Sequence, residues 1–359
     1  MLRLRENIGG PDPRIASTVD TTTAPRPAGE VLAWSRDVID PALRTAVGTL
    51  SASVRRVVDF HFGWSDENGN PAAGAAGKAI RPALALLCAE AAGGSSEAAL
   101  PAAVAVELVH NHSLLHDDII DGDLLRRHRP TAWSVFGVRP AILAGDALLT
   151  LAFDTLAGGG PAEEALCLLS AAQQDLLDGQ MADLAFESRG DVRLEECISM
   201  ARAKTGALLG CACALGQLVA TDDWARIEHA RAFGERLGLA FQLVDDILGI
   251  WGDPAVTGKV IHSDLAARKK SLPIVAALNS ETSPGRELAL LYDRCEPLSA
   301  EDIARAAALV TASGGRAWTE AEASRQLTAA LGELRRARAS GRAAAELEAL
   351  ARLVTTRDH

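Results

Sequence analysis

Aromatic residues are scarce in this chain of 359 residues, at 4%, with a single tyrosine. Strands are enriched in aromatic and β-branched side chains, whereas the runs ALALLCAEAAG and RAAAELEALARL are rich in Ala and Leu, which favour helices. The composition therefore excludes an all-β fold. Because 48% of the residues are hydrophobic and only 23% are charged, it also excludes a chain that is disordered throughout.

The chain has no excess of positive charge. Its 36 basic and 47 acidic residues give a net charge of −11. An acidic field repels polyanions, so we expect no nucleic-acid partner. No run of about 18 uncharged apolar residues occurs, and the N-terminus lacks the apolar segment of a signal peptide. We therefore expect a cytoplasmic protein without a membrane span.

The cysteines form neither a CxxC pair nor a zinc-type spacing with histidine. All of them lie in apolar segments with helical periodicity, so we expect buried, reduced thiols. They are Cys88, Cys167, Cys197, Cys211, Cys213 and Cys295.

The first residues differ in composition from the rest of the chain. Residues 1–28 are rich in Thr, Pro, Asp and Gly and have too few apolar side chains to offset the entropy of ordering. We predict a disordered tail over residues 1–28, which could dock a partner, and one helical domain over residues 29–359. From Glu30 onward apolar residues recur at spacings of three and four, and no convincing strand pattern follows.

The segment LLHDDIIDGDLLRRHRPT carries the first acidic motif. Asp117 and Asp121 are four residues apart and share one helix face, with Asp118 about 100° away. Such carboxylates repel one another unless a cation lies among them, and oxygen ligands without His or Cys favour Mg²⁺. Taken alone, the motif is more often a solvated acidic helix face than a metal site.

The second acidic pair is Asp245 and Asp246, in the apolar helix LGLAFQLVDDILGIWGD. Unpaired buried charge is costly, so these carboxylates require a partner. The two acidic clusters therefore suggest opposing walls of one cavity, bridged by Mg²⁺ and a diphosphate.

Basic residues follow both acidic clusters, and another pair begins an earlier helix. Arginine offers bidentate donors to phosphate and lysine a compact charge, so the combination predicts binding of two diphosphates. The basic residues are Lys78, Arg81, Arg126, Arg127, Lys259, Lys269 and Lys270.

These segments resemble, in the same order, the motifs of trans-isoprenyl diphosphate synthases, the polyprenyl synthetase family, over about residues 30 to 350. GKAIRP resembles GKRxRP, AKTG resembles the KT motif, LLDGQMADL resembles GQxxDL, and the two acidic segments resemble the family's aspartate-rich motifs. The resemblance implies an all-α, isoprenoid synthase-type helical bundle around a central apolar cavity, and a homodimer. It also implies a transferase of isoprenoid biosynthesis that condenses isopentenyl diphosphate with an allylic diphosphate, using Mg²⁺.

Carried over position by position, the resemblance assigns roles to individual residues. Isopentenyl diphosphate would be bound by Lys78, Arg81, His110 and Arg127. The allylic diphosphate would be bound by Arg126, Lys204, Lys259 and Lys269. Mg²⁺ would be held by Asp117, Asp121 and Asp245, supported by Asp118 and Asp246. Beside Lys204, the catalytic residues Thr205 and Gln242 would direct oxygens at the allylic cation.

The chain departs from the family pattern in the second acidic segment. Gly249 stands where a third carboxylate is usual, and Asp253 is the candidate replacement four residues on. Other departures are Ala79 for Arg, His262 for Gly, and Ala267 and Arg268 for Glu and Gly.

Product length in the family depends on side chains just before the first acidic motif, here His112 and Ser113. One mid-sized and one small residue predict a C20 product, geranylgeranyl diphosphate, with C15 and C25 as neighbouring outcomes. His112 and His116 are also spaced like a zinc pair, but without a further N or S ligand nearby in the sequence we favour packing for both.

Two alternatives remain open at this stage. A class I terpene cyclase is also helical with a DDxxD motif, but the chain has no N-D-x-x-S-x-x-x-E segment. A non-catalytic subunit of a prenyl diphosphate synthase is the second alternative, for which Gly249 is the only indication.

Overall fold

The computed structural model describes residues 24–72, 77, 79–158, 161–253, 262–294 and 296–355. Nearly all of this part of the chain is helical, so the predicted all-α fold is confirmed. The two named strands of this part form a short antiparallel hairpin of β1 (Leu125–Arg126) and β2 (Arg129–Pro130), in which Arg126 pairs with Arg129. This hairpin directly follows the first acidic motif.

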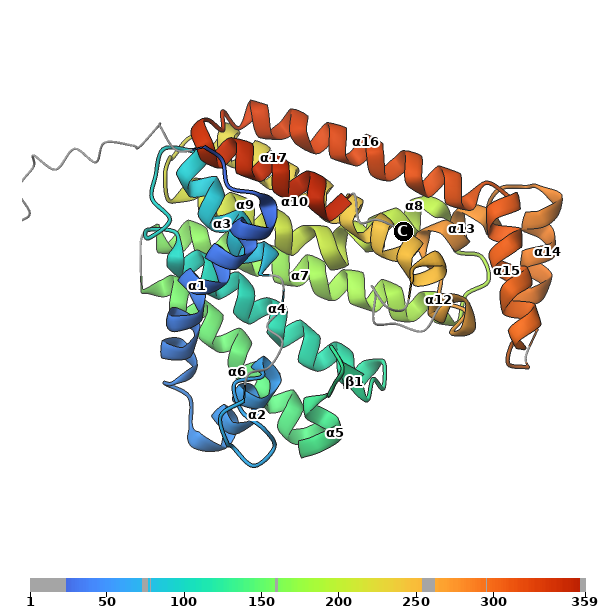
Figure 1. The fold of residues 1–359 in the computed structure, drawn as a ribbon, viewed down its shortest axis with the longest axis horizontal. Coiled ribbons are helices and arrows are strands. Elements are labelled where there is room, and N and C mark those ends of the chain that lie inside the picture. The colour runs from blue at the N-terminus through green and yellow to red at the C-terminus, as the bar shows by residue number, and fades with distance from the viewer. Residues whose placement is uncertain are drawn as a thin grey trace, which may run out of the picture.

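The helices follow one another with short connections (Figure 1). They are α1 (Ala28–Val47), α2 (Ala52–Phe62), α3 (Ile80–Ala91), α4 (Leu100–Ile120), α5 (Ala132–Phe136), α6 (Val138–Ala157), α7 (Ala162–Glu187), α8 (Leu194–Ala201), α9 (Ala207–Leu218), α10 (Trp224–Trp251), α12 (Ser263–Ala266), α13 (Leu272–Leu278), α14 (Ser283–Tyr292), α15 (Ala300–Ala312), α16 (Gly315–Arg336) and α17 (Gly341–Thr355). A π-helical turn, η1 (Arg202–Gly206), joins α8 to α9 without a break.

Helix α10 lies inside the bundle, packed against α9 and α16, while α4 packs against α6 and α3 against α9. Helices α16 and α17 run along the upper side in Figure 1, and α14 and α15 form one end. Leucine, alanine and valine fill the space between these helices, and Phe233 is among the largest side chains that are fully buried. This apolar interior is the main source of stability for a fold of this kind.

Glycines allow α9 and η1 to approach their neighbours closely. A Cβ added to Gly234 would lie 2.4 Å from the Leu209 carbonyl oxygen, and one added to Gly238 would lie 2.6 Å from the Cα of Gly206. Interiors packed to this density cannot absorb an added methyl group without a backbone shift. The glycines therefore fix where η1, which carries the AKTG motif, lies against α10.

The folded domain begins earlier than predicted. Arg26, assigned to the tail from its sequence, forms an ion pair of 2.6 Å with the fully buried carboxylate of Glu346 in α17, and its guanidinium lies 4.0 Å from the Trp34 ring centroid. The predicted boundary at residue 28 therefore lies too late. The rest of the predicted tail, residues 1–23, lies outside the described residues.

The thiols agree with the prediction at four positions, Cys88, Cys197, Cys211 and Cys213, which are buried and free. Cys167 is exposed, which corrects the expectation for that residue. It lies on α7 two residues from the buried Ala165, and two residues along a helix correspond to a rotation of about 200°. Cys295 lies outside the described residues.

Among the described helices, α6 is long and apolar enough to cross a membrane by length and composition. It packs extensively against α4, however, and carries the charged residues Arg139, Asp146 and Asp154. Core helices of globular proteins pass the same test, so this is weak evidence for a membrane span.

Candidate active site

Two of the three carboxylates of the first acidic motif come together at the end of α4. Burial raises the pKa values of both Asp117 and Asp121, while the ammonium group of Lys204 opposes the shift at each. Proximity of Asp121 raises the pKa of Asp117 further. Carboxylates held together in this way are stabilised by a cation, and oxygen donors of this kind fit a hard divalent metal ion.

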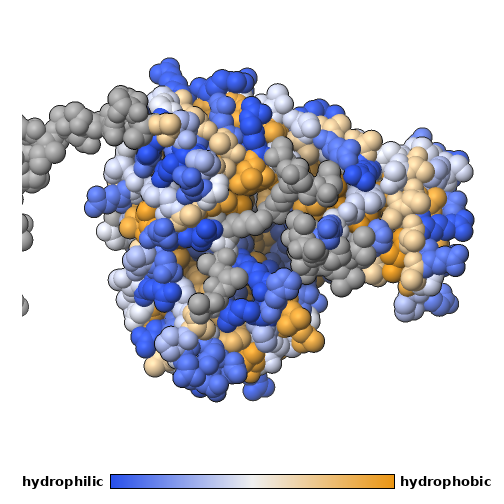
Figure 2. All heavy atoms as spheres, in the orientation of Figure 1, coloured by the Kyte–Doolittle hydropathy of each residue, from blue (hydrophilic) through white to orange (hydrophobic). Residues whose placement is uncertain are grey.

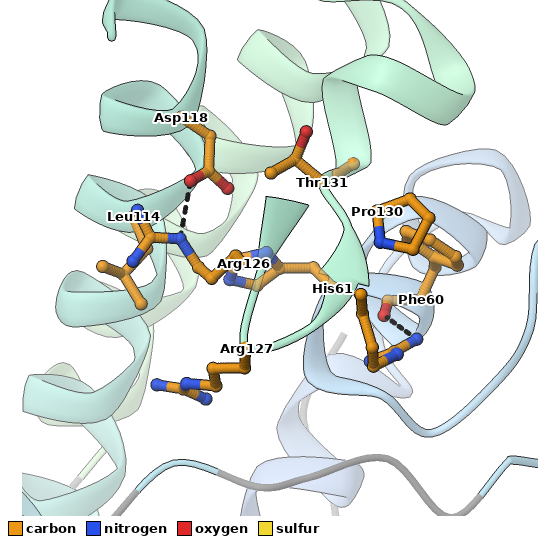
Figure 3. A pocket seen from close by; sticks show the side chains of 10 residues that line it. Phe60, His61, Leu114, Asp118, Arg126, Arg127, Pro130 and Thr131 are labelled. Atoms are coloured by element: carbon orange, nitrogen blue, oxygen red, sulfur yellow. Dashed lines mark hydrogen bonds and ion pairs between the residues drawn. The ribbon is translucent and has the colours of Figure 1, made fainter. Parts of the chain in front are cut away.

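Asp118, the third carboxylate, points away from this pair towards the hairpin. Its Oδ1 accepts a hydrogen bond of 2.6 Å from Nε of Arg126, while its buried Oδ2 has no hydrogen-bond partner in the part of the chain that is described. In this structure Arg126, the predicted ligand of the allylic diphosphate, is thus paired with a carboxylate (Figure 3).

The second acidic pair lies on α10, where Asp246 is buried and Asp245 is partly exposed. Oδ1 of Asp246 accepts a hydrogen bond from the Gln242 amide at 2.7 Å, and Oδ2 accepts one from the Leu272 backbone N–H at 2.9 Å. Burial nevertheless raises the pKa of Asp246 to about 7. Both of its oxygens are engaged, so this carboxylate is held in a fixed orientation.

The hydrogen-bond chain continues to the KT motif. The Thr205 hydroxyl donates to Gln242 Oε1 at 2.8 Å, and Gln242 in turn donates to Asp246. Two of the three predicted catalytic residues, Thr205 and Gln242, therefore contact each other directly. Because the hydroxyl proton is engaged, the oxygen lone pairs of Thr205 remain available to an electron-poor group.

Lys269 links the two acidic clusters. Burial lowers the pKa of this lysine, but the carboxylates of Asp246, Asp264, Asp183 and Asp121 more than offset that effect, and the net pKa is raised. These carboxylates come from α10, α12, α7 and the end of α4. The clusters that lie far apart in sequence are therefore parts of one site.

Asp264 occupies the space left by Gly249. A Cβ added to Gly249 would lie 2.5 Å from Oδ2 of Asp264, so this position of the carboxylate depends on the absence of a side chain at residue 249. Sequence reasoning assigned no role to Asp264, which lies eleven residues after Asp253, the last residue of the segment LGLAFQLVDDILGIWGD. Asp253, the candidate replacement, stays a prediction.

Asp183 is a second residue that sequence reasoning missed. Its Oδ2 lies 2.6 Å from Nζ of Lys204. Helix α7 and the π-helical turn η1 approach closely here, since a Cβ on Gly179 would lie 2.3 Å from the Lys204 backbone nitrogen. The GQMADL segment was the available signal, and its glycine and aspartate both act on the conformation of Lys204. π-helical turns such as η1, on which Lys204 lies, often occur at functional sites.

A second group of side chains near Arg126 is strongly basic and consists of Arg81, His110 and Arg127. Burial lowers the pKa of Arg81 to about 10, and Glu107 opposes this shift. The pKa of His110 is lowered well below its usual value by burial and by Arg81 and Arg127. Nε of Arg81 is buried without a hydrogen-bond partner among the described residues. An anion would satisfy this group and offset the repulsion between the cations.

His61, from α2, belongs to the same group and was not predicted. Burial and the charges of Arg126 and Arg127 lower its pKa to about 3, so it is neutral. Its Nε2 hydrogen-bonds to Asn111 Oδ1 at 3.1 Å. Figure 3 shows His61 beside Arg126 and Arg127 in a pocket that is lined by residues of α2, α4 and the hairpin. Nothing in the motifs around residue 61 indicated this position, because it depends on how α2 packs.

The surface around the hairpin is mixed in character. Figure 2 shows hydrophilic residues beside apolar ones in the area where Figure 1 places β1 and the end of α4, and Leu124 and Leu125 are 61% and 65% exposed. Two predicted diphosphate ligands, Lys78 and Lys259, lie outside the described residues.

The predicted product-length residues lie earlier on α4. His112 is 4% exposed, and its Nε2 accepts a hydrogen bond of 3.3 Å from the Gln173 amide of α7. Ser113 is also buried, and its hydroxyl donates to the His110 carbonyl oxygen at 2.8 Å. Both side chains are therefore turned into the bundle.

Comparison with known proteins agrees with this arrangement. The sequence profile described as polyprenyl synthetase matches residues 64–310. The chain is 46% identical over 332 residues to a (2E,6E)-farnesyl diphosphate synthase of Mycobacterium tuberculosis (strain ATCC 25618 / H37Rv), covering 91% of this chain and 92% of the relative. It is 46% identical over 297 residues to a geranylgeranyl diphosphate synthase of the same strain, covering 82% and 85%.

Among solved structures, a polyprenyl synthetase from Streptomyces coelicolor A3(2) superimposes with a TM-score of 0.86 at 46% identity, covering 90% of this chain and 98% of that one. The fold and these relatives define a helical enzyme of the trans-prenyltransferase class. The chain belongs to the polyprenyl synthetase family. The resemblance found in its motifs is thereby confirmed, and the relatives are named for two different product lengths.

Proposed function

We propose that this prenyltransferase condenses isopentenyl diphosphate head-to-tail with an allylic diphosphate, in the presence of Mg²⁺, to give a linear all-trans C20 diphosphate. The observation that carries the proposal is the convergence of both acidic clusters on Lys269, next to a separate buried basic group. Such a site has one place for a metal-bound diphosphate and another for a metal-free one.

The donor set fits Mg²⁺. Asp117, Asp121 and Asp245 offer only oxygen, which this ion prefers, and substrate phosphate and water commonly complete its coordination. When bound, Mg²⁺ would neutralise charge on the leaving diphosphate. Lys204 and Lys269 would donate to the same group, and Arg126 would join them by exchanging Asp118 for phosphate oxygen.

The second substrate would lie in the basic group. Arg81, Arg127, His110 and the predicted ligand Lys78 would hold the diphosphate of isopentenyl diphosphate, with its double bond directed at the allylic carbon. The C–O bond of the allylic diphosphate breaks, the allylic C1 bonds to C4 of isopentenyl diphosphate, and a C2 proton passes to the released diphosphate. The lone pairs of Thr205 would stabilise the cation formed in between.

The C20 product is supported by His112 and Ser113, neither of which is large enough to close an apolar tunnel. Replacing Ser113 by Phe is expected to shorten the product to C15, and His112→Ala to lengthen it towards C25. Ser134→Phe is a matched control outside α4. Unchanged products in both α4 variants would contradict this assignment of product length.

The decisive experiment incubates the purified protein with Mg²⁺, isopentenyl diphosphate and, separately, dimethylallyl, geranyl and farnesyl diphosphates. Products are identified by mass spectrometry before and after phosphatase treatment. A linear C20 alcohol that appears only after phosphatase supports the proposal, and a C15 alcohol overturns the product length alone. A hydrocarbon without phosphatase indicates a cyclase, and no product from any starter indicates a non-catalytic subunit.

We further propose a cytoplasmic homodimer. The support is a set of apolar side chains exposed on α6 and α7, including Leu143, Leu177 and Met181 at 62%, 50% and 67%. A monomer mass by light scattering would contradict the dimer. Deletion of residues 1–23 tests whether the N-terminal segment docks a partner, because unchanged co-purification would exclude that role.

A further inference from the structure

A second group of potential metal ligands lies away from the acidic clusters. His112 and His116 lie one turn apart on α4, and Asp146 approaches them from α6. One ligand atom from each residue can be chosen so that all lie within 4.8 Å of one another. Nε2 of His116 is 3.7 Å from Oδ1 of Asp146. The expectation that the two histidines merely pack rested on finding no further N or S ligand nearby in the sequence, whereas Asp146 supplies an oxygen ligand from another helix.

His112 carries an unsatisfied ring nitrogen. Its Nδ1 is buried and makes no hydrogen bond of ordinary geometry among the described residues. A weaker backbone contact of the ring with Gly145, which opposes the fall in the pKa of His112, would be replaced by a metal. The other nitrogen, Nε2, faces the Gln173 amide at 3.3 Å, and the amide oxygen of Gln173 is also buried without a partner. A metal on Nδ1 would leave Nε2 protonated, and the oxygen of a flipped Gln173 amide would then accept a hydrogen bond from Nε2–H. Histidine ligands usually have such a partner on the second nitrogen.

Gly145 provides the space in which the two rings lie. A Cβ there would be 2.4 Å from Nε2 of His116 and 3.4 Å from Nδ1 of His112. The ring centroids are 4.5 Å apart. The place where α6 crosses α4 therefore holds two imidazoles and the exposed carboxylate of the next residue, Asp146.

We propose that His112, His116 and Asp146 bind a transition-metal ion of the Zn²⁺ type, at a site separate from the carboxylates that serve the diphosphates. Two imidazoles and a carboxylate are a ligand set that suits Zn²⁺, with water in the remaining position. Tetrahedral bonds of about 2.0–2.1 Å place ligand atoms roughly 3.4 Å apart, so the present spacing closes with small ring rotations.

Metal binding would replace one existing hydrogen bond of His116. Nε2 of His116 hydrogen-bonds to the Ile142 carbonyl oxygen at 3.2 Å, and a metal would replace that bond. The neighbouring Asp117 takes no part, because successive residues of a helix point about 100° apart.

The test uses Co²⁺ as a spectroscopic probe of the full-length, metal-free protein in millimolar Mg²⁺, which occupies the other carboxylates. We expect uptake of one equivalent with the visible absorption of a tetrahedral nitrogen–oxygen site, followed by displacement by Zn²⁺. Even outer partners of metal sites contribute about 10–100-fold to affinity, so Asp146→Asn and His116→Gln should each weaken binding at least about tenfold. The matched control is Asp154→Asn, an exposed aspartate farther along α6.

Thermal unfolding confirms that each variant is folded, and the binding assay needs no substrate, so its outcome is independent of the proposed enzymatic reaction. The proposal is overturned if the wild-type protein binds no Co²⁺ above Mg²⁺, or if Asp154→Asn weakens binding as much as Asp146→Asn. It is also overturned if Asp121→Asn abolishes the signal while Asp146→Asn leaves it intact, because the probe would then report the diphosphate site.

Discussion

Replacing Asp246 by asparagine is expected to stabilise the protein while impairing catalysis. The pKa of this carboxyl is about 7 in the folded state, against about 3.9 in an unfolded chain. Between these values the folded state binds more protons than the unfolded state, so stability falls as the pH rises through this interval. The loss amounts to about 4 kcal/mol at pH 8 and about 1.5 kcal/mol at pH 5.

Asparagine removes this loss without leaving a polar atom unpaired, because the hydrogen-bond chain can reverse. The oxygen of the introduced amide would accept from Leu272 N–H, its nitrogen would donate to Gln242 Oε1, and the Gln242 amide would donate to Thr205. The hydroxyl of Thr205 then accepts instead of donating, so its lone pairs no longer face the substrate freely. We expect kcat to fall as stability rises.

The measurement is thermal unfolding in chelator across pH 5 to 8. A gain of about 4 kcal/mol corresponds to roughly 6 °C in Tm for a domain of this size, and the gain should shrink to about 2–3 °C at pH 5. Asp245→Asn is the control, since it removes the same charge one residue earlier and leaves the chain of hydrogen bonds intact. A Tm difference between the two variants that does not grow with pH would refute the reasoning.

Two further substitutions test other parts of the site and fold. Gly249→Ala should lower the free energy of unfolding by about 1–3 kcal/mol and reduce activity, because the added Cβ displaces Asp264. The control is Gly332→Ala, since a Cβ at Gly332 would lie in open space. Equal Tm values for the two variants in thermal melts would contradict the role of Gly249. Glu346→Ala should cost about 3–5 kcal/mol in urea unfolding, because it leaves the guanidinium of Arg26 without its buried partner; a loss below about 1 kcal/mol would mean that the pair is no stronger than a surface one.

The helical architecture could be predicted from the sequence because Ala- and Leu-rich periodicity acts locally. The acidic clusters and the KT motif could also be predicted, since a helix places residues four apart on one face. Contacts between separate helices could not be predicted. Asp264 fills the gap at Gly249 only because α12 folds back onto α10, and Asp146 meets His116 only because α6 crosses α4.

The same limit applies to the extent of the domain and to the basic group. Arg26 lies in a segment whose composition favours disorder, yet it is held by a buried carboxylate far along the chain and by the ring of Trp34. His61 has no motif around it, and its neutral state follows from burial among arginines that approach from the hairpin.

The π-helical turn η1 separates the position of the KT motif from the packing of the helices on either side of it. A π turn holds one residue more than an α turn at nearly the same net rotation, so deleting one residue between Arg202 and Gly206 would restore a regular helix and leave α8 and α9 in their present orientations. Gly216 would still fit against the Ala85 carbonyl, while the side chains of η1 would move around the helix axis. In protein engineering, a one-residue deletion at this point should therefore displace the KT motif without repacking α9.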